Sequence, residues 1–148
     1  MPLDQSFVGR TYPPTAPYLV GREKIREFAT AIGATDPAYH DPEAARALGY
    51  PDVVAPPTFP VVITFAASQQ IIDDPALGID FSRVVHGEQR FTYTRPVVAG
   101  DELVCVNTIE DVSSRGGHDF LGTRTEVTTV SGEPVVTVWS KLVVRGEG

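Results

Sequence analysis

The sequence predicts an α+β fold in which an antiparallel sheet wraps around one long central helix, preceded by an N-terminal helical excursion. An apolar segment over 59–72 is hydrophobic on nearly all sides, which indicates a buried helix. Turn residues between the strand-like segments that follow favour antiparallel hairpins. With 148 residues and no linker or repeat, the chain is expected to form a single domain over 1–148. The strand-like segments lie over 83–95, 102–112, 119–130 and 134–145.

The N-terminal part carries the signals of two helices. Residues 1–20 are rich in proline and predict an extended segment. A helix over 22–32 is indicated by an apolar stripe, and Gly33 ends it. A second helix is expected over 42–48, with Asp41 as N-cap and Pro42 in its first turn. The stripe of the first helix consists of Ile25, Phe28, Ala29 and Ile32.

The central helix and the last strand have the clearest local patterns. Thr58 is expected to cap the central helix, and Pro60 fits its first turn. The segment 134–145 alternates between apolar and polar residues, as a strand with one buried face does. Ser140 is a polar exception on its apolar face. That face carries Val136, Val138, Leu142 and Val144, and the other carries Thr137, Trp139 and Lys141.

Composition excludes several classes of function. The net charge of −7 argues against nucleic acid and anionic membrane surfaces as partners. No apolar run approaches the roughly 20 residues that span a bilayer, and no signal-peptide pattern is present, so we expect a cytoplasmic protein. The single Cys105 excludes an internal disulfide, and the scattered histidines give no metal-site spacing. We therefore expect neither a metal nor a cofactor.

An anionic thioester ligand would require a local basic patch. Its candidate residues are Arg22, Lys24, Arg26, Arg46, Arg83, Arg90 and Arg95. A solvated surface of mixed charge is the simpler interpretation for most of them.

Five segments resemble a known family. The chain is similar to MaoC-like hotdog proteins of the (R)-specific enoyl-thioester hydratase and dehydratase superfamily. More narrowly, it resembles actinobacterial proteins with a FAS1-like dehydratase domain and the non-catalytic subunits of mycobacterial (3R)-hydroxyacyl-carrier-protein dehydratases. The resemblance implies a hotdog fold and an acyl-CoA or acyl-carrier-protein ligand. Together with the open edges of a small sheet, it favours a homodimer or a heterodimer with a catalytic hotdog subunit. The segments are 21–29, 44–50, 55–59, 86–91 and 95–101.

Active members of that superfamily carry a motif close to Gly-Asp-x-Asn-Pro-x-His, whose Asp and His act as acid and base on one water. Here the corresponding segment is 33–41. Alignment on Asp36-Pro37 places Ala34 at the Asp position and Tyr39 at the His position. Alignment on His40 places Thr35 at the Asp position. Neither register supplies both groups.

The family's oxyanion hole is altered as well. The resemblance implies a backbone N–H donor from a glycine in the turn before the central helix. In this chain Pro57-Thr58 stands there, and proline has no N–H to donate. Two altered elements favour a subunit that binds the acyl thioester while another chain performs the catalysis. The residues expected to contact substrate are Pro57, Thr58, Phe59, Val62, Phe65 and His86.

Two enzymatic alternatives stay open. In the first, Asp36 and His40 form a shifted catalytic pair in a self-sufficient homodimeric hydratase; the simpler interpretation is that Asp36 caps the turn before Pro37 and His40 is a loop residue. In the second, the protein is a hotdog thioesterase, whose family places a carboxylate on or near the central helix. No Asp or Glu occurs over 59–72, which counts against that activity. His86 is expected either to line the acyl site or the dimer interface, or to bond a backbone group.

Overall fold

One antiparallel sheet and four α-helices make up the computed structural model, which describes residues 3–146. The strand order in the sheet is β1-β3-β4-β5-β2, so the edges are β1 and β2. The strands are β1 (Tyr18–Leu19), β2 (Val84–Tyr93), β3 (Glu102–Arg115), β4 (His118–Thr129) and β5 (Pro134–Val144). The helices are α1 (Arg22–Ala31), α2 (Pro42–Ala47), α3 (Val61–Ala67) and α4 (Gln69–Ile72).

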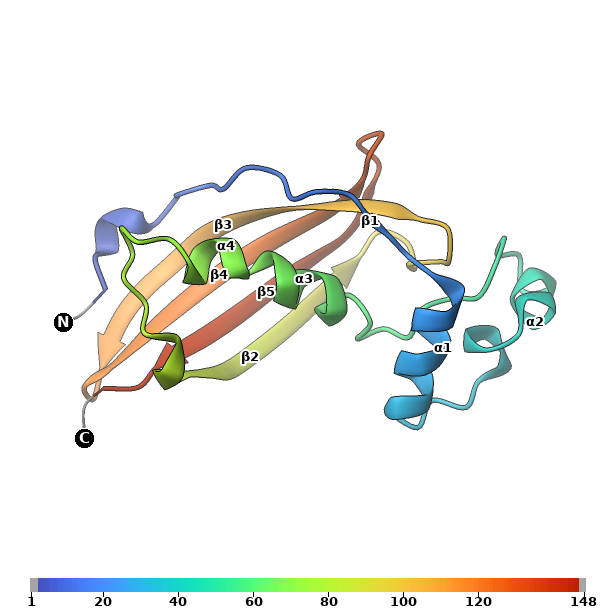
Figure 1. Cartoon of the computed structure of the whole chain (residues 1–148), viewed down its shortest axis with the longest axis horizontal. Coiled ribbons are helices and arrows are strands. Elements are labelled where there is room, and N and C mark those ends of the chain that lie inside the picture. The colour runs from blue at the N-terminus through green and yellow to red at the C-terminus, as the bar shows by residue number, and fades with distance from the viewer. Residues whose placement is uncertain (1–2, 147–148) are drawn as a thin grey trace.

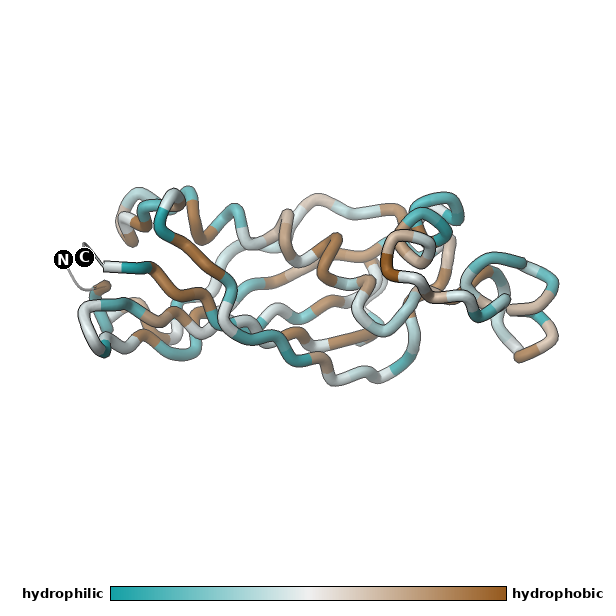
Figure 2. The backbone as a smooth tube through the Cα atoms, turned by 90° about the horizontal axis from the view of Figure 1, so that it is seen from below, coloured by the Kyte–Doolittle hydropathy of each residue, from teal (hydrophilic) through white to brown (hydrophobic). Residues whose placement is uncertain are grey.

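The curved sheet holds α3 and α4 against its concave face, which confirms the predicted fold class (Figure 1). Helices α1 and α2 project beyond one end of the sheet as the excursion. The described chain begins and ends at the opposite end (Figure 2). Within residues 3–146 no helix is both long and apolar enough to cross a membrane.

The core lies between α3, α1 and the concave face of the sheet. Phe59 is fully buried there and meets Phe28 edge to face, with ring centroids 5.5 Å apart. Of the predicted apolar stripe of α1, Ile25 and Ala29 are buried and Phe28 packs against the core. Ile32 was wrongly assigned to this stripe: it follows the end of α1 and is 51% exposed.

The central helix is not continuous, contrary to the sequence prediction. The N–H groups of Ile71 and Ile72 both donate to the carbonyl of Ser68, which leaves the Ala67 carbonyl outside the helical pattern. Buried Asn107 donates to that carbonyl from Nδ2 at 2.9 Å. A side chain that inserts at a helix carbonyl is a common cause of a helix break. The N-cap is also Pro60 rather than Thr58.

The all-round burial predicted for this helix is likewise wrong for one face. Ile63, Thr64 and Ala67 are buried against the sheet, but Phe65 is 70% exposed and Ala66 is exposed as well. The reason is geometric: one sheet covers one face of a helix. The opposite face of α3 stays uncovered in the single chain, and this matters for the site.

The two edges of the sheet differ. The N-terminal segment runs beside β3. The N–H of Tyr12 donates to the backbone carbonyl of Asn107 at 2.9 Å, and the N–H of Thr15 donates to that of Cys105 at 3.0 Å. The predicted hairpins are present, with β3 paired to β4 and β4 to β5. Edge strand β2 pairs only with β5, so its other side remains available.

Candidate functional site

The motif segment places Asp36 and His40 in the loop between α1 and α2. The Asp36 carboxylate accepts a hydrogen bond from the N–H of Ala38 at 3.0 Å and so caps a single 3₁₀ turn over Pro37–Tyr39. The His40 ring is half-buried, and its Nε2 lies 2.8 Å from the carbonyl oxygen of Ala34. No hydrogen bond joins the two side chains within the described residues. Both groups therefore hold the local backbone.

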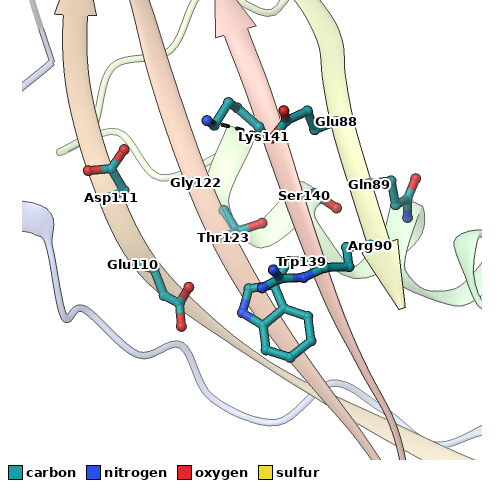
Figure 3. A pocket seen from close by; sticks show the side chains of 10 residues that line it. All are labelled: Glu88, Gln89, Arg90, Glu110, Asp111, Gly122, Thr123, Trp139, Ser140 and Lys141. Atoms are coloured by element: carbon teal, nitrogen blue, oxygen red, sulfur yellow. Dashed lines mark ion pairs between the residues drawn. The ribbon is translucent and has the colours of Figure 1, made fainter. Parts of the chain in front are cut away.

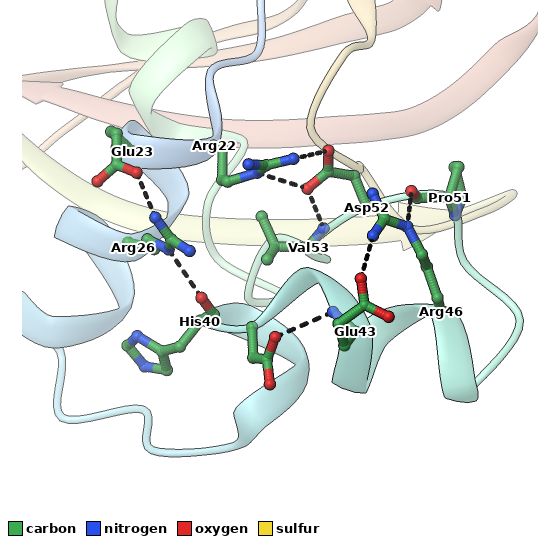
Figure 4. A network of polar contacts seen from close by, with 10 residues as sticks. Arg22, Glu23, Arg26, His40, Glu43, Arg46, Pro51, Asp52 and Val53 are labelled. Carbon is green, nitrogen blue, oxygen red and sulfur yellow. Dashed lines mark hydrogen bonds and ion pairs between the residues drawn. The ribbon is translucent and has the colours of Figure 1, made fainter.

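Two arginines one turn apart on α1 fix this excursion (Figure 4). Arg26 donates from Nε to the carbonyl of His40 at 2.7 Å. Arg22 donates two hydrogen bonds to the Asp52 carboxylate, from Nε to Oδ1 at 2.9 Å and from Nη2 to Oδ2 at 2.7 Å. Hydrogen bonding to Arg22 lowers the pKa of Asp52 below its usual value. Arg26 thus holds the loop before α2, and Arg22 holds the segment that follows α2.

The candidate cations of a basic patch are mostly matched by carboxylates. Six of the seven form ion pairs, which leaves little unpaired positive charge for a phosphate or an acidic carrier protein. Arg90 instead stacks over the Trp139 ring at 4.3 Å. The pairs are Arg22–Asp52, Lys24–Glu27, Arg26–Glu23, Arg46–Glu43, Arg83–Asp80 and Arg95 with both Asp101 and Glu133.

The turn before α3 offers few backbone donors. Pro57 has no N–H, and its carbonyl accepts a hydrogen bond from the Tyr93 hydroxyl. The N–H of Phe59 donates to Pro56 at 2.9 Å. Pro57 and Thr58 are both exposed at this turn.

Two cavities flank the uncovered face of α3. The larger, which we name the α3 groove, has a volume of about 320 Å³ and lies between α3, α4 and the inner face of β2, β4 and β5. The smaller, about 230 Å³, lies between α3 and the N-terminal segment Thr15–Tyr18. The α3 groove is lined by Val61, Thr64, Phe65, Ser68, Ile72, Phe81, Val84, His86, Gln89, Thr123, Ser140 and Leu142.

The residues predicted to contact substrate divide between these places. Phe65 and His86 line the α3 groove, and Val62 lines the smaller cavity. Phe59 belongs to the closed core and lines neither. Sequence reasoning missed the polar residues Thr64, Gln89 and Thr123 of the groove. Ser140, the exception in the pattern of β5, was the only signal for them.

A third depression lies on the other face of the sheet (Figure 3). Its volume is about 710 Å³, and its lining mixes carboxylates with cations. An ion pair of 3.6 Å joins Lys141 to Glu88, beside the stacked Arg90 and Trp139. Internal pairing satisfies most of these charges, and the depression lacks the apolar walls of an acyl site.

The remaining reactive groups offer no separate chemistry. Cys105 is fully buried, as expected of a small core residue, and burial raises the pKa of its thiol to about 12. Between residues 3 and 146, no cluster of three or more His, Cys, Asp or Glu side chains could hold a metal ion. The acyl-sized grooves and the Asp36–His40 loop are therefore the features to compare with known proteins.

The chain is similar in sequence to UPF0336 proteins of actinobacteria. The family model for the FAS1-like, dehydratase domain region matches residues 6–138. A UPF0336 protein of Streptomyces avermitilis is 62% identical over 145 residues, covering 98% of this chain and 97% of that protein. A UPF0336 protein of Saccharopolyspora erythraea is 60% identical over 146 residues, covering 99% of this chain and 94% of that one.

Solved structures agree with the sequence family. One chain of the HadBC (3R-hydroxyacyl-ACP dehydratase) complex from Mycobacterium tuberculosis is 35% identical, with a TM-score of 0.83 over 93% of this chain and 96% of that one. A MaoC-like dehydratase is 34% identical, with a TM-score of 0.87 over 95% of this chain and 43% of that longer one. An (R)-hydratase from A. caviae shares the fold at 18% identity and a TM-score of 0.69, over 91% and 94% of the two chains. The chain thus belongs to the family of the FAS1-like dehydratase domain region and has the hotdog fold of the MaoC-like dehydratases.

Proposed function

We propose that this chain is the acyl-thioester-binding subunit of a (3R)-hydroxyacyl-thioester dehydratase, or enoyl-thioester hydratase, whose acid–base pair resides on a partner hotdog chain. One observation carries the proposal: Asp36 and His40 are both engaged by local backbone groups, at 3.0 and 2.8 Å. Neither side chain lines the two cavities beside α3 or the depression on the other face of the sheet. A general acid–base pair must instead reach one substrate or one water.

The uncovered surface of the chain supports a partner. Phe65 on α3 is 70% exposed, Phe81 before β2 is 56% exposed and Val85 on β2 is 42% exposed. Exposed aromatic residues next to an unpaired strand edge are typical of a surface that another chain covers. The similar HadBC structure is itself a complex of hotdog chains. We therefore propose that α3 and the free edge of β2 meet the partner subunit.

The two cavities beside α3 support acyl binding. They lie on either side of the exposed helix face, so a partner that covers this face would close them into one enclosed space. Apolar walls with few charged groups suit an alkyl chain. In this arrangement Val62, Phe65 and neighbouring apolar residues hold the tail. The partner's acid and base act on the water and the α-carbon, with an oxyanion hole for the thioester enolate.

A second candidate is a homodimeric hydratase that uses Asp36 and His40 itself. The carbonyl of Ala34 can only accept, so it selects the His40 tautomer with the proton on Nε2. The Nδ1 atom then keeps its lone pair and has no partner among the described residues. An oriented imidazole of this kind is suited to act as a base. A thioesterase is favoured less, because α3 and α4 carry no carboxylate.

The deciding experiment compares the chain alone with the chain co-expressed with a hotdog protein that has the intact motif. Hydration of a crotonyl thioester and dehydration of (R)-3-hydroxyacyl thioesters are measured, with and without His40→Ala. The proposal expects activity only in the complex and no effect of His40→Ala on kcat. Activity of the chain alone that His40→Ala abolishes would establish the second candidate instead. Failure of the two chains to co-elute would contradict the subunit role.

A further inference from the structure

The floor of the α3 groove contains a row of polar side chains that form no hydrogen bond with the described part of the chain. Ser140 on β5 pairs directly with Gln89 on β2 and with Thr123 on β4, so the three residues form one line across three strands. All three line the groove, and Thr64 of α3 lines it too. We name Gln89, Ser140 and Thr123 the polar row.

The polar row interrupts an apolar surface. On one side of it, the next residues of the same face are Phe91, Val138 and Thr125, and the Thr125 hydroxyl already donates to Asn107. On the other side are Leu142 and Leu121, which pair with each other. A ligand that follows β5 therefore passes Val138, then the polar row, then Leu142, which has His86 beside it on β2.

These polar groups have no partners in the protein. No hydrogen bond to a described residue is made by the side chains of Gln89, Ser140, Thr123 or Thr64. Thr123 and Thr64 are each only 5% exposed. Neither hydroxyl is a fully buried unpaired atom, since among the described residues only Arg124 Nε is one, so both hydroxyls open into the groove. A polar group that loses its water on binding without gaining a hydrogen bond destabilises the complex. Once a partner subunit covers α3, the ligand or a trapped water has to satisfy the row.

The chemistry of the row limits its ligand. Hydroxyl and amide groups both donate and accept, and they carry no charge. No Lys, Arg, Asp or Glu lines the groove, and His86 is its only titratable residue. A phosphate or carboxylate would therefore enter without a counter-charge, whereas a neutral oxygen would find donors and acceptors on both walls.

We infer that the α3 groove selects acyl chains bearing a neutral oxygen function, a hydroxyl or keto group, at the chain position that meets the polar row. This inference rests on the proposed acyl-binding function and specifies its substrate class. The apolar surface on either side of the row holds the alkyl segments before and after the oxygen. Selectivity arises because an unsubstituted chain leaves the row unpaired.

The test uses the complex of the full chain with its partner hotdog subunit and non-hydrolysable thioether analogues of acyl pantetheine, with Kd measured by calorimetry. One analogue has a saturated chain, and the others carry a single hydroxyl moved stepwise along it. At least one isomer is expected to bind about five- to tenfold more tightly than the saturated chain, as one net hydrogen bond would provide. The double variant Thr123→Val/Ser140→Ala is expected to lose this preference and to bind the saturated chain at least as tightly.

Two controls keep the test decisive. Thr137→Val makes the same change on the opposite face of β5, where Thr137 pairs with Glu126 and Thr92, and should keep the preference. Ser140→Ala alone replaces the double variant if the latter does not fold. Equal binding of all analogues, or a preference that survives in the variants, would overturn the inference alone. No binding of any analogue would overturn the proposed acyl-binding function together with it.

Discussion

At the scale of single residues, the polar groups of this chain serve the fold wherever the structure gives them a partner. Asp101, which follows Gly100, illustrates this. Its carboxylate accepts from the N–H of Val98 at 2.9 Å and from Arg95 through two bonds of 3.0 Å. Asp36 and Asp41 act in the same way as caps of short helical turns, as the sequence predicted for Asp41.

Asn107 is a buried polar residue whose loss should lower the stability of the fold. It is fully buried, donates to the Ala67 carbonyl and to Gln70, and accepts from Thr125 at 2.7 Å. Asn107→Leu should lower the free energy of unfolding by about 2–4 kcal/mol, because it leaves buried groups unpaired. Urea denaturation measures this.

Thr125→Val provides the matched comparison, since it removes one of the same bonds. It should lower the free energy of unfolding by about 1 kcal/mol. Equal stabilities of Asn107→Leu and the wild type would contradict the role given to Asn107 in the helix break.

At the scale of elements, the N-terminal segment is fastened to the end of α4 by one carboxylate. Asp74 accepts from the Tyr12 hydroxyl at 2.8 Å and from Arg10 at 2.7 Å. The hydrogen bond from Tyr12 is the largest cause of a lowered pKa of Asp74, and the hydrogen bond from Arg10 lowers this pKa further. Burial and the hydrogen bond to Asp74 raise the pKa of Tyr12 to about 12, with burial the larger cause. Ionised Asp74 therefore adds to the backbone bonds with β3 and to the bond from Gln70 to the Pro13 carbonyl, which hold the same segment.

Acid should loosen this fastening in a defined way. The pKa of Asp74 is lower in the folded state than in the unfolded state, where it is about 4. Ionised Asp74 therefore stabilises the fold fully at pH values above the unfolded-state pKa. This stabilisation is lost as the pH falls through the folded-state pKa. Asp74→Asn should therefore lower the unfolding free energy at pH 7. The difference from the wild type should shrink below about pH 4. Urea titrations from pH 7 to 3 measure it.

Tyr12→Phe is the control for that experiment. It keeps the ring and removes the bond that contributes most to the lowered pKa of Asp74, so it should reduce the steepness of acid destabilisation. A difference between Asp74→Asn and the wild type that stays constant with pH would exclude an ionised Asp74 as the fastening group.

At the scale of the whole molecule, the uncovered face of α3 and the free edge of β2 should determine assembly. Phe65→Glu places a charge on a side chain that is 70% exposed, so the free energy of unfolding of the single chain should change little. The same change should abolish association with a second hotdog chain, because the charge would be buried without a partner. Light scattering and co-purification read out the two effects.

Leu48→Glu is a matched control at the far end of the excursion. Leu48 is 64% exposed and follows α2, away from α3 and β2. It should leave association intact. Loss of association in both variants, or in neither, would place the interface elsewhere.

The sequence by itself determined the elements whose signals are local. The stripe of α1, the caps of α2, the alternation of β5 and the glycine-rich turns each depend on residues close in the chain. The structure confirms them except for Ile32, which lies outside the stripe. The order of these elements, with the family segments, was also enough for the fold class. The hypothesis of an altered motif came from the resemblance, which specifies the residue types expected at those positions.

Only the tertiary structure decided the features that depend on contacts across the sheet. The break at Ser68 depends on Asn107, about 40 residues away in the chain, and the exposed face of α3 depends on how far one sheet reaches around a helix. The polar row joins three strands whose register no local pattern specifies, so Ser140 alone hinted at it. Likewise, Asp36 and His40 lie four residues apart, yet their hydrogen bonds go to different backbone groups. Proximity in sequence suggested a catalytic pair, but the direction of each side chain is set by the fold around it.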